Sequence, residues 1–147
     1  MPTIRQLLTD DHRHCDDLLA GAEKAVAQKD LPRARSAFAA YCQGMQAHFA
    51  AEEATLFPAF EAATGMTEGP TRVMRVEHRQ ISGLLDEAAT ALANGDADGY
   101  LGLVDTLVIM MQQHNMKEEN ILYPMCDQHL ADEADDLVEE LQAALVA

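Results

Sequence analysis

The stretch HFAAEEATLFP, residues 48–58, recurs as HNMKEENILYP at residues 114–124. Each copy carries a histidine and a glutamate four positions apart, then a second glutamate, and ends on an aromatic residue and a proline. Positions four apart lie on one face of an α-helix, with Cβ atoms about 5–6 Å apart. The two copies therefore predict two helices, each presenting an imidazole beside a carboxylate.

The recurrence belongs to a longer repeat with a constant offset. The differences 114 − 48, 118 − 52 and 124 − 58 are all 66, and 78 − 12 gives the same value for two further histidines. Two similar helical hairpins pack naturally about a pseudo-twofold axis, and residues near that axis meet matching partners from both halves. Four of the six histidines occupy matched positions, namely His12, His48, His78 and His114.

Hydrophobic periodicity predicts the fold. Apolar residues recur at spacings of three and four along the chain, and the alternation typical of strands is absent. The sequence therefore predicts an all-α domain over residues 1–147, an up-down-up-down antiparallel four-helix bundle. Its two hairpins span about 3–63 and about 70–130, and a short fifth helix over about 132–146 packs on the bundle or on a partner. The proline of each motif copy is expected to kink or end its helix.

Composition narrows the class of partner. Among 147 residues, 25 are acidic and 10 are basic, which gives a formal net charge of -15. Such a chain is repelled by nucleic acid and by anionic membrane surfaces. No apolar stretch approaches a membrane span, no signal-peptide pattern is visible, and the three cysteines are scattered. We therefore expect a cytoplasmic protein with reduced cysteines and with neither nucleic-acid nor membrane partners.

The repeat-matched histidines and glutamates form a ligand set for two metal ions. A carboxylate can bridge two ions, so each ion receives two imidazole nitrogens and two bridge oxygens. A solvent-derived oxo or hydroxo bridge makes each ion five-coordinate and leaves octahedral iron one open position. The alternative, a core of hydrogen-bonded histidines without metal, leaves buried carboxylates unpaired at several kcal/mol each. The predicted ligands are His12, His48, Glu52, His78, His114 and Glu118.

At these residues the chain resembles the hemerythrin-like family, also called the HHE cation-binding domain, from about Asp10 to Met125. The resemblance rests on the order and spacing of His12, the first motif copy, Glu77-His78 and the second motif copy. It implies a non-heme di-iron centre on the six residues above, with manganese or zinc as less favoured metals. It also implies reversible chemistry with dioxygen, nitric oxide or peroxide.

The chain departs from the oxygen-carrying members of that family. Those carry a second histidine one turn before the histidine of the third helix, and here that position is Met74. They also place an aspartate, at a different spacing, where this chain has Glu118. A symmetric four-histidine site leaves both irons open, which disfavours stable oxygen carriage.

The expected function is therefore binding of, or redox reaction with, these small molecules in oxidative or nitrosative stress. An oxidoreductase directed at peroxide or nitric oxide is one form of this function. An iron-donating repair protein or an iron-storage protein is the alternative. A homodimer is an open alternative for the assembly.

Four acidic residues adjoin the predicted ligands and have two interpretations each. Glu53 and Glu119 follow the motif glutamates, and either supply a further ligand or proton relay or remain solvated or salt-bridged. Asp11 and Glu77 precede His12 and His78, and either hydrogen-bond a ligand imidazole or lie on the surface. Solvated or salt-bridged positions are expected for the first pair, and surface positions for the second.

Three larger side chains also fall near the predicted centre. Met74 is expected to fill the core, because a thioether is a soft ligand. Tyr41 and Tyr123 either line a cavity and present a hydroxyl to a bound molecule or serve as core aromatics. Because Tyr123 matches Phe57 in the repeat, a core role is the default for it.

Overall fold

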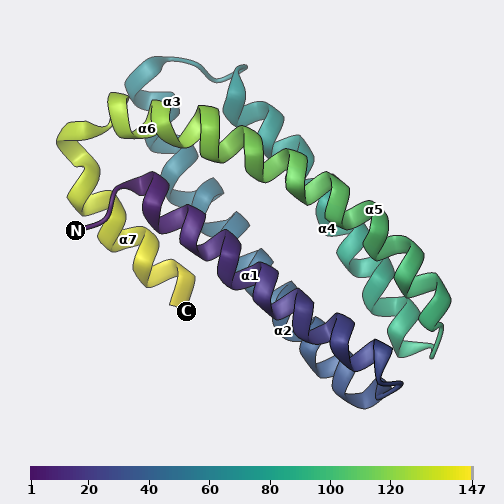
Figure 1. The fold of residues 1–147 in the computed structure, drawn as a ribbon. Coiled ribbons are helices and arrows are strands. Elements are labelled where there is room, and N and C mark those ends of the chain that lie inside the picture. The colour runs from purple at the N-terminus through teal and green to yellow at the C-terminus, as the bar shows by residue number, and fades with distance from the viewer. Residues whose placement is uncertain (147) are drawn as a thin grey trace.

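Four long antiparallel helices dominate the computed structural model, which describes residues 1–146 (Figure 1). A shorter C-terminal helix lies beside the N-terminal part of the first helix (Figure 1). The predicted all-α bundle with a short C-terminal helix is confirmed. Its helices are α1 (Ile4–Ala27), α2 (Leu31–Ala51), α3 (Phe57–Thr64), α4 (Pro70–Ala93), α5 (Ala97–Lys117), α6 (Tyr123–His129) and α7 (Ala134–Val146). Two π-helical segments, η1 (Glu52–Leu56) and η2 (Glu118–Leu122), join α2 to α3 and α5 to α6, and a 3₁₀ turn, η3 (Ala131–Glu133), precedes α7.

The element boundaries follow the 66-residue offset of the sequence. Adding 66 to the first and last residues of α1, α2 and η1 gives the first and last residues of α4, α5 and η2. Two of the helix starts are built alike, since Asp30 and Asp96 each accept a backbone hydrogen bond three residues on, from Arg33 and Gly99. The two halves therefore have the same helix boundaries even where their side chains differ.

The π-helical segments explain how the helices continue through the motif prolines. Pro58 has no N–H, and in a regular α-helix its ring would clash with the carbonyl four residues back. In η1 the Phe57 N–H bonds instead to the Glu52 carbonyl, five residues back, and Tyr123 bonds to Glu118 in the same way. Neither proline ends its helix, because α3 and α6 follow the π-helical segments directly, and α6 ends at His129, close to the expected end of the second hairpin near residue 130.

The interior consists of two apolar clusters with a polar layer between them. One cluster fills the half of the bundle around Phe38 and Tyr100. The other lies at the opposite end around Phe60 and Leu122, where α7 packs against α1, α2 and η1 and adds Leu141. Along each long helix the predicted ligands fall between residues of the two clusters, so apolar packing shields the polar layer from both ends.

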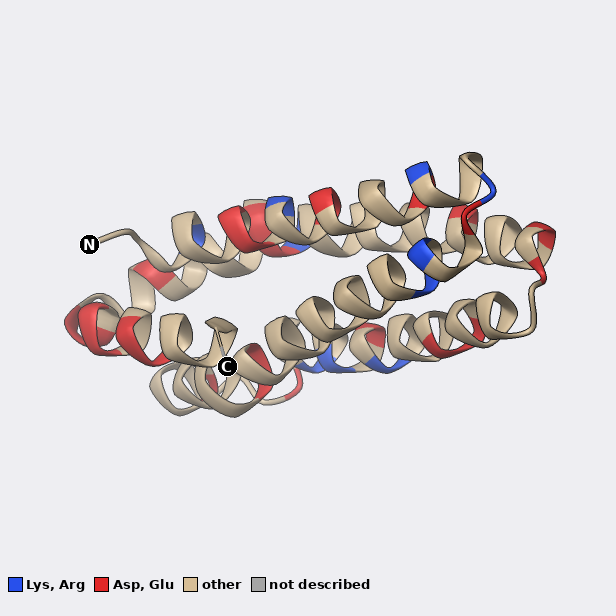
Figure 2. Ribbon diagram, turned by 90° about the horizontal axis from the view of Figure 1, so that it is seen from below, with Lys and Arg blue, Asp and Glu red and all other residues tan. Residues whose placement is uncertain are grey.

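The surface carries the acidic excess of the sequence. Asp and Glu are spread along the helices and clearly outnumber Lys and Arg (Figure 2). Of the helices within residues 1–146, none combines the length and the apolar character that crossing a bilayer requires.

Candidate metal centre

The structure brings all six predicted ligands into the polar layer, from all four long helices and the two π-helical segments. Each of the six is at most 3% exposed. They form two overlapping groups whose donor atoms lie within 4.8 Å of one another, and Glu118 belongs to both. One group holds His12, His48 and Glu118, and the other holds Glu52, His78, His114 and Glu118.

Four buried atoms of this layer that could bind a metal ion have no hydrogen-bond partner within residues 1–146. They are Glu52 Oε1, His78 Nε2, His114 Nε2 and Glu118 Oε2. His78 Nε2 lies 3.1 Å from Glu52 Oε1, and His114 Nε2 lies 3.3 Å from Glu118 Oε1, yet neither pair is aligned as a hydrogen bond. Leaving buried polar atoms unpaired costs about 1–3 kcal/mol each. Imidazole nitrogens and carboxylate oxygens aimed at one point fit metal ions.

A ring of carboxylates holds the other nitrogen of every imidazole. Each Nδ1 faces one carboxylate from a neighbouring element, at 2.7 Å for His12–Glu119, His48–Asp11 and His78–Glu53 and at 2.9 Å for His114–Glu77. The expected surface positions of Asp11 and Glu77 are therefore wrong. Glu53 lies 3.9 Å from Arg75, as expected for a salt-bridged position, but both Glu53 and Glu119 also contact a predicted ligand, His78 and His12 respectively. With Nδ1 held in this way, Nε2 is the nitrogen that faces the centre.

The sequence held a signal for this ring. Positions 11 and 77 are both acidic, and so are positions 53 and 119, so both pairs survive the divergence of the two halves. Matching these pairs through the repeat identifies them together with the histidines. Helix geometry alone does not identify these carboxylates, because each one bonds to a histidine on another element and not to the histidine beside it in sequence.

Charge coupling dominates the protonation of the centre. Burial lowers the pKa of His48, but the Glu52 charge and the hydrogen bond to Asp11 outweigh burial and raise it to about 10. Burial likewise lowers the pKa of His114, while Glu118 raises it, with a net value of about 9. For Glu52, burial raises the pKa and His48 lowers it, and the net pKa lies well below its usual range. The layer therefore favours the binding of positively charged species next to the carboxylates of Glu52 and Glu118.

Tyr123 breaks the symmetry of the centre. Its ring is fully buried, and its hydroxyl lies 2.7 Å from Glu52 Oε2, 3.0 Å from Glu118 Oε1 and 3.2 Å from Nε2 of both His12 and His48. Burial, and then the nearby carboxylates, raise the pKa of this phenol well above its usual value, so it is a hydrogen-bond donor. Tyr123 stacks on His12, and its repeat partner Phe57 stacks on His78 in the same way but has no hydroxyl. Tyr123 belongs to the apolar cluster around Phe60 and Leu122, as its default core role predicts, and its hydroxyl also contacts the predicted ligands.

The remaining residues singled out in the sequence lie outside the polar layer. Met74 is 3% exposed and belongs to the apolar cluster closed by α7, as expected for core filling. Tyr41 lies in the opposite cluster and lines a pocket between α1 and α5. Cys15, Cys42 and Cys126 are free thiols, in line with the expected reduced state.

Comparison with known proteins agrees with this geometry. The model of the hemerythrin HHE cation binding domain matches residues 3–126, a range that contains every predicted ligand. No curated protein and no solved structure matches the chain. The family match spans most of the 147 residues, and the chain therefore belongs to the hemerythrin HHE cation-binding domain family, which makes it a metal-binding protein.

Proposed function

We propose that the polar layer holds two iron ions and that the protein binds or reacts with dioxygen, nitric oxide or peroxide there. His12 and His48 would hold one ion and His78 and His114 the other, with the two buried glutamates shared between them. The observation that carries this proposal is the set of four buried, unpartnered donor atoms. In the family at large, such a pair of irons supplies reversible binding and redox chemistry toward small molecules.

The chain's own residues prepare the site for that chemistry in three ways. The carboxylate ring fixes each imidazole with Nε2 inward, so that the nitrogens are already oriented before an ion arrives. The apolar clusters on either side exclude bulk water, which strengthens electrostatic interactions in the layer. The Tyr123 hydroxyl is the one phenolic donor in hydrogen-bond contact with the predicted ligands among residues 1–146.

Redox or binding chemistry is favoured over stable oxygen carriage, because Met74 packs in the apolar core where carriers have a fifth histidine. Donation of iron to damaged clusters, or iron storage, is the second candidate function. The two candidates differ in what happens to the metal: a binding or redox protein retains its iron through a reaction cycle, and a donor loses it.

Metal analysis of purified variants tests the ligand set. We expect about two irons per chain in the parent protein, by analogy with di-iron sites in helix bundles. His48→Ala and Glu118→Ala should lose most of the iron, while His14→Ala, at an exposed histidine, should retain it. Full iron content in both ligand variants would contradict the assignment.

Rapid-mixing spectroscopy separates the functions. The protein is reduced anaerobically and mixed in turn with dioxygen, nitric oxide and hydrogen peroxide. A long-lived adduct supports small-molecule binding, and repeated consumption of peroxide or nitric oxide supports an oxidoreductase. Loss of iron on reduction, with no spectral response to any of the three, supports donation.

A further inference from the structure

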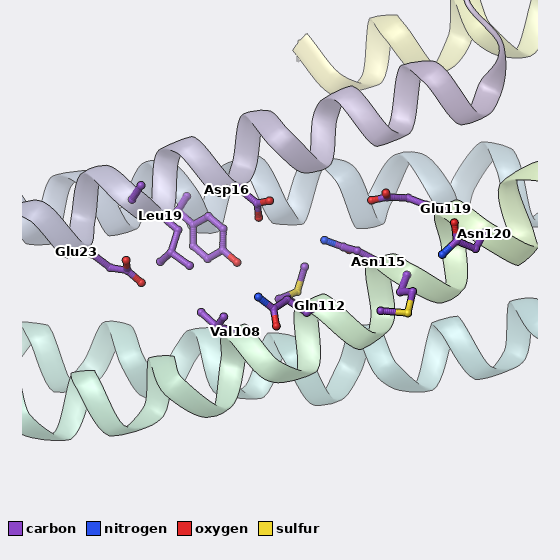
Figure 3. A pocket seen from close by; sticks show the side chains of 12 residues that line it. Asp16, Leu19, Glu23, Val108, Gln112, Asn115, Glu119 and Asn120 are labelled. Carbon is purple, nitrogen blue, oxygen red and sulfur yellow. The ribbon is translucent and has the colours of Figure 1, made fainter.

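A second feature next to the polar layer lies outside the proposed function. A pocket of about 540 Å³ opens between α1 and α5. Its volume falls in the range of about 300–1,000 Å³ that is typical of sites for organic ligands, and it far exceeds the needs of a diatomic gas. Figure 3 shows Asp16 and Glu23 entering it from α1, and Asn115 and Glu119 from the opposite side.

The lining of this pocket is acidic and amphipathic. Asp16, Glu23 and Glu119 are its charged residues, and no Lys, Arg or His of the described chain lines it. Burial raises the pKa of Asp16, His12 opposes this effect, and the charge of Glu119 adds to it. Leu19 of α1 and Val108 and Met111 of α5 add apolar surface on both sides of the pocket. An anion would be repelled here, whereas a cation with an apolar body would find both kinds of contact.

Two polar side chains in this pocket lack partners within residues 1–146. Asn115 Oδ1 is buried and makes no hydrogen bond. Tyr41 is 2% exposed and lines the pocket, and its hydroxyl bonds to no residue of the described chain. The residue that matches Tyr41 in the repeat is Leu107, whose side chain has no polar atom. The hydroxyl of Tyr41 is therefore particular to this side of the repeat. Unsatisfied acceptors and hydroxyls at a cavity wall are groups that a bound ligand can satisfy.

The repeat supplies an internal comparison. The matched groove between α2 and α4 is lined by Phe49, which stands where this pocket has Asn115. Phe49 stacks on His78 with ring centroids 4.0 Å apart and covers that side of the polar layer. The same groove has Ser82 in place of Asp16, and it also carries Arg79. The two grooves have similar volumes, about 520 and 540 Å³, but the one between α2 and α4 is lined by an aromatic ring and is mixed in charge, whereas the one between α1 and α5 is acidic.

We propose that the pocket between α1 and α5 binds a small organic cation. Its ammonium group would lie between Asp16 and Glu119, and its apolar part against Leu19 and Val108, in the direction of Glu23. Glu119 also accepts the hydrogen bond of His12, so an occupant of the pocket sits one side chain away from the polar layer. This inference does not depend on the metal, and the site can be tested in protein with or without iron.

A pair of probes that differ in charge tests the proposal. Tyramine and 4-hydroxyphenylacetate share a phenol ring and carry an ammonium and a carboxylate, respectively. Calorimetric titration of the 147-residue chain should show tyramine binding at least about tenfold tighter than 4-hydroxyphenylacetate, because the acidic pocket repels a carboxylate. Amide NMR shifts on the metal-free protein should map to Asp16 and Asn115.

Two variants copied from the matched groove locate the site. Asn115→Phe removes the unpaired Oδ1 acceptor from the pocket wall and should weaken tyramine binding about two- to tenfold, the size of one hydrogen bond. Asp16→Ser changes an exposed position and should weaken it about two- to fivefold, the size of one exposed ion pair. Gln46→Ala, in the matched groove, is the control and should leave binding unchanged.

Equal binding of the two probes, absence of tyramine binding at millimolar concentration, or unchanged binding in both pocket variants would overturn the proposal. So would NMR shifts that centre on Gln46 and Ser82. Protein that fails to bind iron but binds tyramine as described would contradict the proposed function and leave this inference intact.

Discussion

His48 Nδ1 donates to Asp11 Oδ2 over 2.7 Å, across the interface of α2 and α1. The pair 66 residues further on, His114 and Glu77, repeats this contact at 2.9 Å. In both halves the carboxylate lies one position before a predicted ligand of its own helix and serves the histidine of the next helix. The four imidazoles are therefore oriented by contacts between helices, and the centre should respond to changes one side chain away from it.

Removing one carboxylate of the ring tests this dependence. Asp11→Ala leaves His48 Nδ1 without an acceptor and frees the His48 imidazole to rotate. We expect iron affinity to fall about 10–100-fold, the usual effect of losing such a partner, while the fold is retained. Competition against a chelator of known affinity measures the change. Asp10→Ala is the matched control, because Asp10 is 73% exposed and pairs only with Arg13 in the described chain. Equal affinities of the two variants would show that the ring does not orient the ligands.

The Tyr123 hydroxyl should contribute most when metal is absent. Tyr123→Phe removes a 2.7 Å hydrogen bond to the buried Glu52 carboxylate, and such bonds to charged groups contribute about 1.5–3 kcal/mol. We expect the free energy of unfolding of the metal-free protein to fall by that amount, and the loss to shrink in iron-loaded protein, where the glutamate has another partner. Denaturant unfolding of both forms measures the difference.

Tyr100→Phe provides the control for that experiment. Tyr100 is equally buried, but its hydroxyl has no hydrogen-bond partner within residues 1–146. Its removal breaks no bond, so stability should change little or rise slightly. A similar loss in both variants would mean that ring packing, and not the contact with Glu52, accounts for the effect.

The thiols should be inert in the native protein. Burial, and then the charges of Asp11 and Asp16, raise the pKa of Cys15 to about 12, and burial followed by Asp86 raises that of Cys42 to about 11. At pH 8 a thiol with a pKa near 12 is ionised in only about one molecule in ten thousand. The α2 backbone also passes so close that a Cβ at Gly44 would stand 3.3 Å from Cys15 Sγ.

We therefore expect little reaction with a disulfide reagent at pH 8 before unfolding, and three thiols per chain after unfolding in guanidinium. The slow native reaction should be confined mainly to Cys42, which is only partly buried, and Cys42→Ser should abolish most of it. Rapid reaction of Cys15 in folded protein would contradict the packing of α1 against α2.

Much of the fold could be predicted because the repeat constrains it. The spacing of His48, Glu52, His114 and Glu118 fixed two helix faces, and the offset then added His12 and His78 on the other two helices. The structure places these six residues together, while their role as metal ligands stays a prediction. Periodicity also located the C-terminal helix, although its packing partner remained open.

The features that could not be predicted all depend on contacts between elements. A π-helical turn and an interrupted helix both accommodate Pro58, and the sequence does not choose between them. The hydroxyl of Tyr123 reaches Glu52 because the two motif copies face each other, and sequence spacing does not record that distance. The carboxylate ring was missed for the same reason, since Asp11 pairs with a histidine 37 positions away.

The C-terminal helix should stabilise the end of the bundle next to the polar layer. Leu141 is fully buried in the apolar cluster that also contains Leu56 and Leu122, each four positions after a predicted glutamate ligand. Leu141→Ala should lower the free energy of unfolding by about 2–5 kcal/mol, the usual cost of such a truncation in a core. Because the cavity would adjoin η1 and η2, iron release to a chelator should also become faster. Glu140→Ala, at the exposed neighbouring position, should change neither quantity. If Leu141→Ala lowers stability but leaves the rate of iron release unchanged, α7 supports the fold alone and does not close the metal centre.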